Sequence, residues 1–109
     1  MATTYKVLGQ ANPAATTATS LYTVGAGKSA VVSTITVCNQ ASSAATFRIA
    51  IRPAGATLAA THYISYDSTV AANDTTALTI GITLAATDII TVYASTTTLS
   101  FNAFGSEIS

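Results

Sequence analysis

The segment Gly25-Ala-Gly-Lys-Ser29 resembles the end of a phosphate-binding loop. That motif needs a glycine five positions before Gly27, where this chain has Tyr22, and a helix must follow it. A β-branched run follows instead. We therefore predict a hairpin turn at this segment and no nucleotide site.

His62, Ser65 and Asp67 supply the residue types of a hydrolytic triad. Alternation along one strand sends Ser65 to the face opposite His62, and no serine lies in a nucleophile-elbow sequence. We expect His62 to pack against Tyr66 or to bond across the sheet, with a proton-sensitive contact between subunits as the alternative. The aspartates stand singly beside turns, which suits turn stabilisation better than paired acid-base catalysis. We thus predict no catalytic residue and no enzyme activity.

Cys38 is the single cysteine, and no second cysteine or paired histidine lies near it in the sequence. Because it sits in a β-branched run, we expect it to be buried as a small hydrophobic residue. Asn73-Asp-Thr75 matches a glycosylation sequon, but we interpret it as a turn because the chain begins without a secretion signal. These residues predict neither a metal site nor a cofactor.

Arg48 and Arg52 lie four residues apart on one face of a predicted strand. Two guanidinium groups in that arrangement could bind a carboxylate on a neighbouring chain. A solvated strand face is the alternative. Because only 7% of the residues are charged, we take these two arginines as candidate contacts with a partner.

Short runs rich in Thr, Val, Ile, Tyr and Phe, separated by turn residues, predict an all-β protein. We expect a single domain over residues 1–109, an antiparallel β-sandwich that is jelly-roll-like or immunoglobulin-like. The stretch 53–60 could be a loop or a helical turn. About eight short strands are predicted, over residues 3–8, 20–24, 29–39, 45–52, 61–67, 78–84, 89–94 and 99–104.

Alternation within these runs predicts which side chains face the interior. The clearest case is 45–52, where Phe47, Ile49 and Ile51 point one way and Arg48, Ala50 and Arg52 the other. In 61–67, alternation opposes His62, Ile64 and Tyr66 to Tyr63 and Ser65. The predicted core contains Val31, Ile35, Val37, Phe47, Ile49, Ile51, Leu78, Ile80, Ile90, Val92, Leu99 and Phe101.

Residues 11–20 form a low-complexity mixture of Ala and Thr around Pro13. Such a segment has too little apolar bulk for a core of its own, so we expect an extended arm or a loop. An arm would gain its order from a neighbour. Pro13, Thr16 and Thr17 are therefore predicted contacts with a partner, alongside the two arginines.

The composition and charge of the chain indicate which classes of partner it can bind. Ala, Thr and Ser make up about half of the chain, and the formal net charge is zero. A neutral surface offers little repulsion between copies, which favours association and predicts a homo-oligomer. The four basic residues are matched by four acidic ones, which argues against nucleic acid as a partner. No run reaches the about 18 apolar residues that span a bilayer, so no membrane partner is predicted.

Several short strings spread over the chain resemble a known group of proteins. They are Tyr5-Lys-Val-Leu-Gly-Gln10, Leu21-Tyr-Thr-Val24, Thr36-Val-Cys-Asn39, Phe47-Arg-Ile-Ala-Ile-Arg-Pro53, His62-Tyr-Ile-Ser-Tyr-Asp67 and Phe101-Asn-Ala-Phe-Gly-Ser-Glu107. The chain is similar to small virion structural proteins of tailed phages that infect cyanobacteria and other aquatic bacteria. This resemblance implies particle assembly and supplies no catalytic residues.

Two functions follow as hypotheses. The first is a non-enzymatic structural subunit of a tailed-phage virion, made in the host cytoplasm and assembled on the capsid, neck or tail exterior through contacts with other virion proteins. The alternative is a virion-attached module that binds a receptor or glycan. Trp is absent and the five tyrosines are spread over several predicted strands, which favours the first.

Overall fold

The computed structural model describes residues 2–109, which contain nine strands and two three-residue 3₁₀ turns. No helix in this part of the chain is long and apolar enough to cross a membrane. The turns are η1 (Pro53–Gly55) and η2 (Ala60–His62). The strands are β1 (Thr3–Ala11), β2 (Thr19–Thr23), β3 (Ser29–Asn39), β4 (Ala45–Arg52), β5 (Tyr63–Val70), β6 (Thr75–Leu78), β7 (Ile82–Leu84), β8 (Ile89–Ala94) and β9 (Leu99–Ile108).

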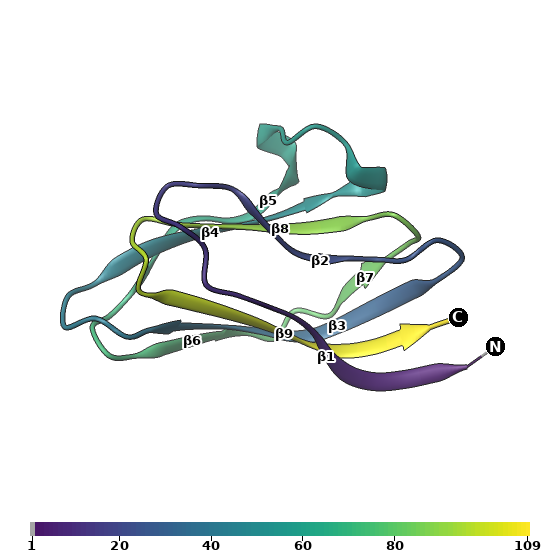
Figure 1. Cartoon of the computed structure of the whole chain (residues 1–109), viewed down its shortest axis with the longest axis horizontal. Coiled ribbons are helices and arrows are strands. Elements are labelled where there is room, and N and C mark those ends of the chain that lie inside the picture. Colours follow the sequence, from purple (N-terminus) through teal and green to yellow (C-terminus); the bar gives the residue numbers. More distant parts are fainter. Residues whose placement is uncertain (1) are drawn as a thin grey trace.

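The strands form two antiparallel sheets that pack against each other (Figure 1). The first sheet has the order β1-β9-β3-β6, with β7 also paired to β3, and the second has the order β2-β8-β4-β5. Strand pairs nest along the chain: β4 with β5, β3 with β6 and β7, β2 with β8, and β1 with β9. One long hairpin folded over itself gives this nesting, which is the jelly-roll arrangement. The predicted all-β sandwich is confirmed.

The interior lies between the sheets and contains most of the predicted core. Phe47 from the second sheet meets Phe101 from the first edge to face, with ring centroids 6.1 Å apart. Ile51 and Leu78 are partly buried against this core. The predicted residues that are fully buried are Ile35, Val37, Phe47, Ile49, Ile90, Val92, Leu99 and Phe101.

Two core predictions were wrong because the strands are irregular. The register of β3 against β9 shifts between Val32 and Thr34, so Ser33 is an extra residue that reverses the alternation. Val31 therefore points outward and is 37% exposed. Ile80 is also exposed, because the predicted strand 78–84 divides into β6 and β7 around Gly81, whose φ is +63°.

The 11–20 segment holds the end of β1, the start of β2 and the loop that carries the chain from the first sheet to the second (Figure 1). The Asn12 side chain donates to the Leu99 carbonyl at 2.6 Å, and the Thr16 amide donates to the Ala94 carbonyl at 2.7 Å. Pro13 is buried, whereas Thr16 and Thr17 are exposed. Bonds within the chain thus order this loop.

The Gly25–Lys28 segment also crosses between the sheets, because β2 belongs to the second sheet and β3 to the first. The prediction of a hairpin turn was therefore wrong, since the flanking strands are not paired with each other. A tight turn does form, in which the Lys28 amide donates to the Gly25 carbonyl. Gly27 has φ +74°, a backbone conformation that glycine adopts without a steric penalty.

Candidate functional site

A bulge in β5 shapes the outer face of the second sheet. Phe47 pairs with Ser68 and Ile49 with Ser65, so the single residue Arg48 on β4 lies opposite two residues on β5. Those two are Tyr66 and Asp67, which form a β-bulge, and Asp67 has a φ of +51°. Both side chains therefore lie beside Arg48.

A second shift in β5 brings another tyrosine to the same face. Ile49 pairs with Ser65 but Ala50 pairs with Tyr63, so Ile64 is passed over. The expected alternation, with Tyr63 and Tyr66 on opposite faces, was wrong because Ile64 is an extra residue between them. The two rings instead meet edge to face, with centroids 4.9 Å apart.

The Arg48 guanidinium lies against two rings and a carboxylate, which we call the Arg48 cluster (Arg48, Tyr66, Asp67 and Tyr93). Its central carbon lies 4.1 Å from the Tyr66 ring centroid and 4.3 Å from that of Tyr93. Its Nε donates to Asp67 Oδ1 at 2.7 Å, and Nη2 donates to Oδ2 at 3.4 Å. The bond to Asp67 raises the pKa of Arg48 above its already high ordinary value, so the cation is permanent.

Arg52 shares this face but binds within the chain. Its Nε donates to the Ala56 carbonyl at 2.7 Å and its Nη2 to the Gly55 carbonyl at 3.3 Å, which anchors the turn after β4. The stretch left open between a loop and a helical turn thus begins with a 3₁₀ turn. The predicted contacts of Arg48 and Arg52 with a partner stay a prediction.

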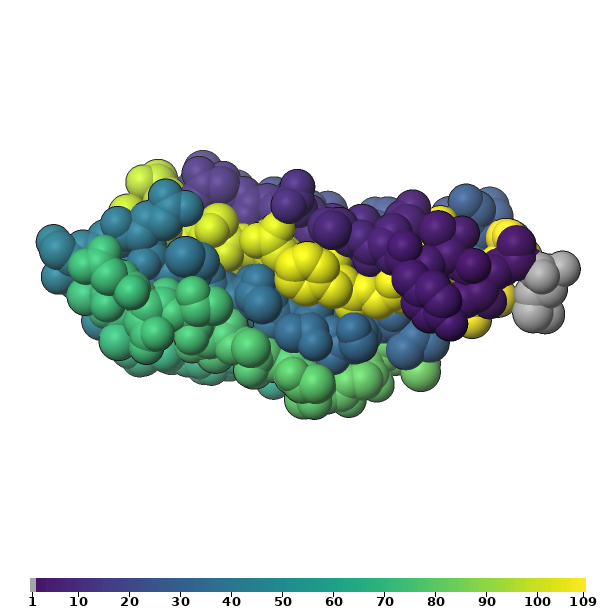
Figure 2. Space-filling view, turned by 90° about the horizontal axis from the view of Figure 1, so that it is seen from below, coloured from purple at the N-terminus to yellow at the C-terminus, as the bar shows by residue number. Residues whose placement is uncertain are grey.

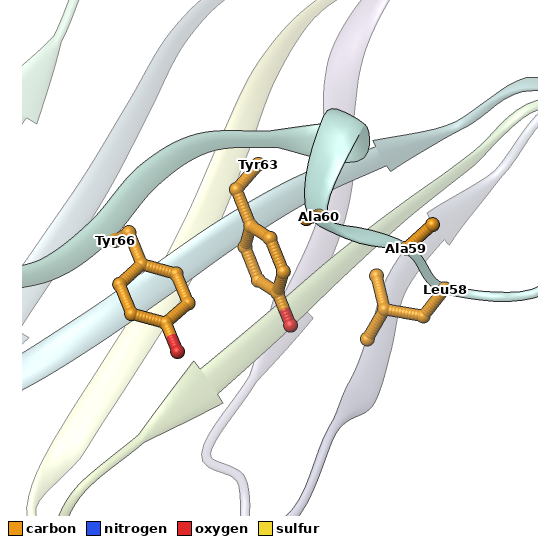
Figure 3. Close-up of a pocket in the computed structure, with 5 residues that line it drawn as sticks. All are labelled: Leu58, Ala59, Ala60, Tyr63 and Tyr66. Carbon is orange, nitrogen blue, oxygen red and sulfur yellow. The ribbon is translucent and has the colours of Figure 1, made fainter.

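Beside the Arg48 cluster is a hollow of about 580 Å³, the tyrosine hollow, lined by Leu58, Ala59, Ala60, Tyr63 and Tyr66. Figure 3 shows both tyrosine hydroxyls directed the same way, with the Tyr63 ring between Tyr66 and Leu58. The wall formed by η2 is braced by His62, whose Nδ1 accepts a hydrogen bond from the Ala59 amide at 3.1 Å. His62 thus bonds to its own turn and not across the sheet.

The residues considered as a triad are not brought together as one. Ser65 lies opposite Ile49 and its Oγ bonds that of Ser68 at 2.6 Å, while Asp67 pairs with Arg48. Asp74 and Asp88 do stabilise turns, since their carboxylates accept hydrogen bonds from backbone amides.

The lone thiol lies apart from these groups. Cys38 is only partly buried, contrary to expectation, because it follows the inward-facing Val37 and therefore points out of the sheet. Within residues 2–109, no three metal-ligating side chains lie close enough together to hold an ion.

The outer face of the first sheet differs in its side chains from the outer face of the second sheet. Two cross-strand rows run over β1, β9 and β3: Tyr5, Ser106 and Val31 form one row, and Val7, Phe104 and Thr34 form the next. We call Tyr5, Val7, Val31 and Phe104 the apolar patch. Figure 2 shows this face, with β9 in yellow between β1 in purple and β3 in blue.

At one end of the interior, Glu107 joins the two sheets. The Tyr22 hydroxyl, from the second sheet, donates to Glu107 Oε2 at 2.6 Å. Lys6 and Lys28 lie 3.3 and 3.4 Å from Oε1, and the Glu107 side chain is 13% exposed. The bond from Tyr22, followed by the lysines, lowers the pKa of Glu107, while burial raises the pKa of Tyr22 above its ordinary range.

No family model, curated protein or solved structure matches this chain. The two outer sheet faces are therefore the features from which its function is inferred.

Sequence reasoning found part of this surface. It placed Arg48 and Arg52 on one face, which β4 confirms through its regular pairing with β8. It missed Tyr63, Tyr66 and Tyr93, because strict alternation separates the first two and nothing in the sequence shows that β8 lies beside β4. The only local signal was Asp67, a residue type that tolerates positive φ and so permits a bulge.

Proposed function

We propose that the chain is a non-enzymatic structural subunit of a tailed-phage virion that assembles through protein–protein contacts. The sequence resemblance to small virion proteins supports this proposal. The jelly-roll pairing also supports it by analogy, because viral capsid domains use this fold, although lectins and other proteins do so too. The observation that carries the proposal is the apolar patch.

The apolar patch exposes large side chains that a solvated sheet face would not need. Tyr5 is 84% exposed and Val7 is 48% exposed, and both lie on the edge strand β1. The polar side chains between and beside them are Ser33, Thr34 and Ser106. Lys6 also lines this surface, and its charge is paired with Glu107. A contiguous apolar surface rimmed by polar groups is typical of a protein–protein interface.

The charge of the whole chain favours the same conclusion. Formal net charge is zero, so copies of the chain do not repel one another at long range. A second copy and other virion proteins are thus both suitable partners, and the proposal includes a homo-oligomer located on the capsid, neck or tail exterior.

The test combines solution and particle measurements on a Tyr5→Ser/Phe104→Ser double variant. We expect the parent chain to self-associate in sedimentation velocity experiments, and the double variant to be largely monomeric and poorly incorporated into particles. Ile80→Thr is the matched control, because Ile80 is 56% exposed but lies outside the apolar patch. A monomeric parent chain whose incorporation is unchanged by the double substitution would overturn the proposal.

A further inference from the structure

We propose that the tyrosine hollow on the second sheet binds a neutral pyranose sugar. This site lies on the sheet opposite the apolar patch and is independent of assembly through that patch. Its volume of about 580 Å³ falls within the usual range for small-ligand sites, which is roughly 300–1,000 Å³.

The first requirement for sugar binding is an aromatic ring with an accessible surface, against which the C–H groups of a pyranose can pack. Tyr66 is 58% exposed. Its ring is already held by the Arg48 guanidinium and by Tyr63, so little side-chain freedom remains to be lost when a ligand binds. Tyr63, Leu58 and Ala60 extend the apolar wall beside it.

The second requirement is a set of fixed polar groups for the sugar hydroxyls. Asp67 is the best candidate, because its side chain is 47% exposed while both carboxylate oxygens are held by Arg48. Each oxygen keeps a further lone pair that can accept a hydrogen bond from a sugar hydroxyl. The parallel hydroxyls of Tyr63 and Tyr66 supply two groups that both donate and accept (Figure 3).

The residues that line the hollow are uncharged, which favours a neutral ligand. Near the hollow, Arg48 is paired with Asp67, and Arg52 donates hydrogen bonds from Nε and Nη2 to backbone carbonyls. In the part of the chain that the structure describes, Arg52 has no carboxylate partner, but its Nε and Nη2 donors are already bound to these carbonyls, so a neutral sugar can use the existing donors and acceptors without bringing a charge of its own.

The backbone adds an independent observation. Asp67 has φ +51°, a conformation that costs a non-glycine residue free energy, and it lies in a bulge that a regular strand would not need. The effect of this bulge is to place the Tyr66 ring and the Asp67 carboxylate side by side. Bulges that redirect side chains in this manner are common next to binding sites.

The experiment is a titration of the ¹⁵N-labelled full chain with the methyl glycosides of glucose, galactose, mannose and N-acetylglucosamine, followed by NMR. We expect at least one glycoside to shift the amides of residues 58–67 with a Kd in the millimolar range. Tyr66→Ala should weaken that binding about tenfold or more, whereas Tyr66→Phe, which keeps the ring, should weaken it less. Tyr5→Ala, on the opposite sheet, is the matched control and should leave it unchanged.

Three results would overturn the inference. They are no shift at residues 58–67 with any of the four glycosides, a shift confined to the apolar patch, and binding that Tyr66→Ala leaves unchanged in a folded variant. Loss of self-association in Tyr66→Ala, without sugar binding by the parent, would assign the hollow to a protein partner instead. Because Tyr5→Ser/Phe104→Ser tests assembly on the other sheet, the two proposals can fail separately.

Discussion

The outer faces of the two sheets are both shaped by β-bulges, but they present different side chains. On the first sheet, bulges at Leu8 in β1 and Ser33 in β3 leave apolar side chains outside, with hydroxyl groups and Lys6 around them. On the second sheet, the bulge at Tyr66 and Asp67 surrounds one arginine with aromatic and acidic groups.

The difference shows that a bulge decides where side chains point, and that their chemistry then decides what the face can bind. The apolar patch has little to offer a small polar ligand, but it can exclude water over an area when another protein covers it. The Arg48 cluster satisfies its own charges, so it suits a small neutral ligand better than a large dry interface. Substitutions in the interior, on the first sheet and between the sheets test how far the two faces are independent.

The largest effect should come from the interior that supports both faces. Phe47→Ala or Phe101→Ala should each lower the free energy of unfolding by about 3–5 kcal/mol, because each leaves a cavity between the sheets. Urea unfolding followed by circular dichroism would measure this loss. Phe104→Ala, on the outer face of the same strand as Phe101, should cost clearly less, and equal costs would mean that the two faces of β9 are misassigned.

A smaller effect should be confined to the first sheet. At Gly105, an added Cβ would overlap the Val31 carbonyl oxygen, because the bulge at Ser33 brings β3 close to β9. Gly105→Ala should therefore cost about 2–3 kcal/mol, since backbone cannot move aside as a flexible side chain can. Gly27→Ala is the control: nothing lies within 4 Å of its Cβ position, so only the positive φ is strained, at about 1 kcal/mol.

The smallest effect concerns the hydrogen bond between the sheets. Tyr22→Phe should cost about 1.5 kcal/mol near neutral pH, because it removes a hydrogen bond from a buried hydroxyl to the Glu107 carboxylate. Chemical unfolding at a series of pH values would measure both this cost and its pH dependence.

The sign of that dependence follows from Glu107. Because its pKa in the folded state lies below the ordinary 4.5, its contribution to stability is present above that pH and is lost as the pH falls through the folded pKa. The difference between Tyr22→Phe and the parent chain should thus shrink in acid. A difference that stays constant down to strongly acidic pH would show that the hydrogen bond does not depend on the charge of Glu107.

The sequence by itself determined the class of fold and much of the core. Turn residues between β-branched runs marked nearly every strand, and strict alternation in 45–52 placed Phe47 inside and Arg48 outside. These features depend on neighbours in sequence, because side-chain direction in a regular strand repeats every two residues.

Only the tertiary structure decided where alternation fails and which strands lie side by side. Val31 faces outward because the pairing of β3 with β9 contains an extra residue, and Tyr63 and Tyr66 share a face because Ile64 is an extra residue in the pairing of β5 with β4. Tyr93 joins them because β8 pairs with β4 across a long stretch of chain. Register and strand order are set by packing of the whole interior, so the composition of a single strand cannot reveal them.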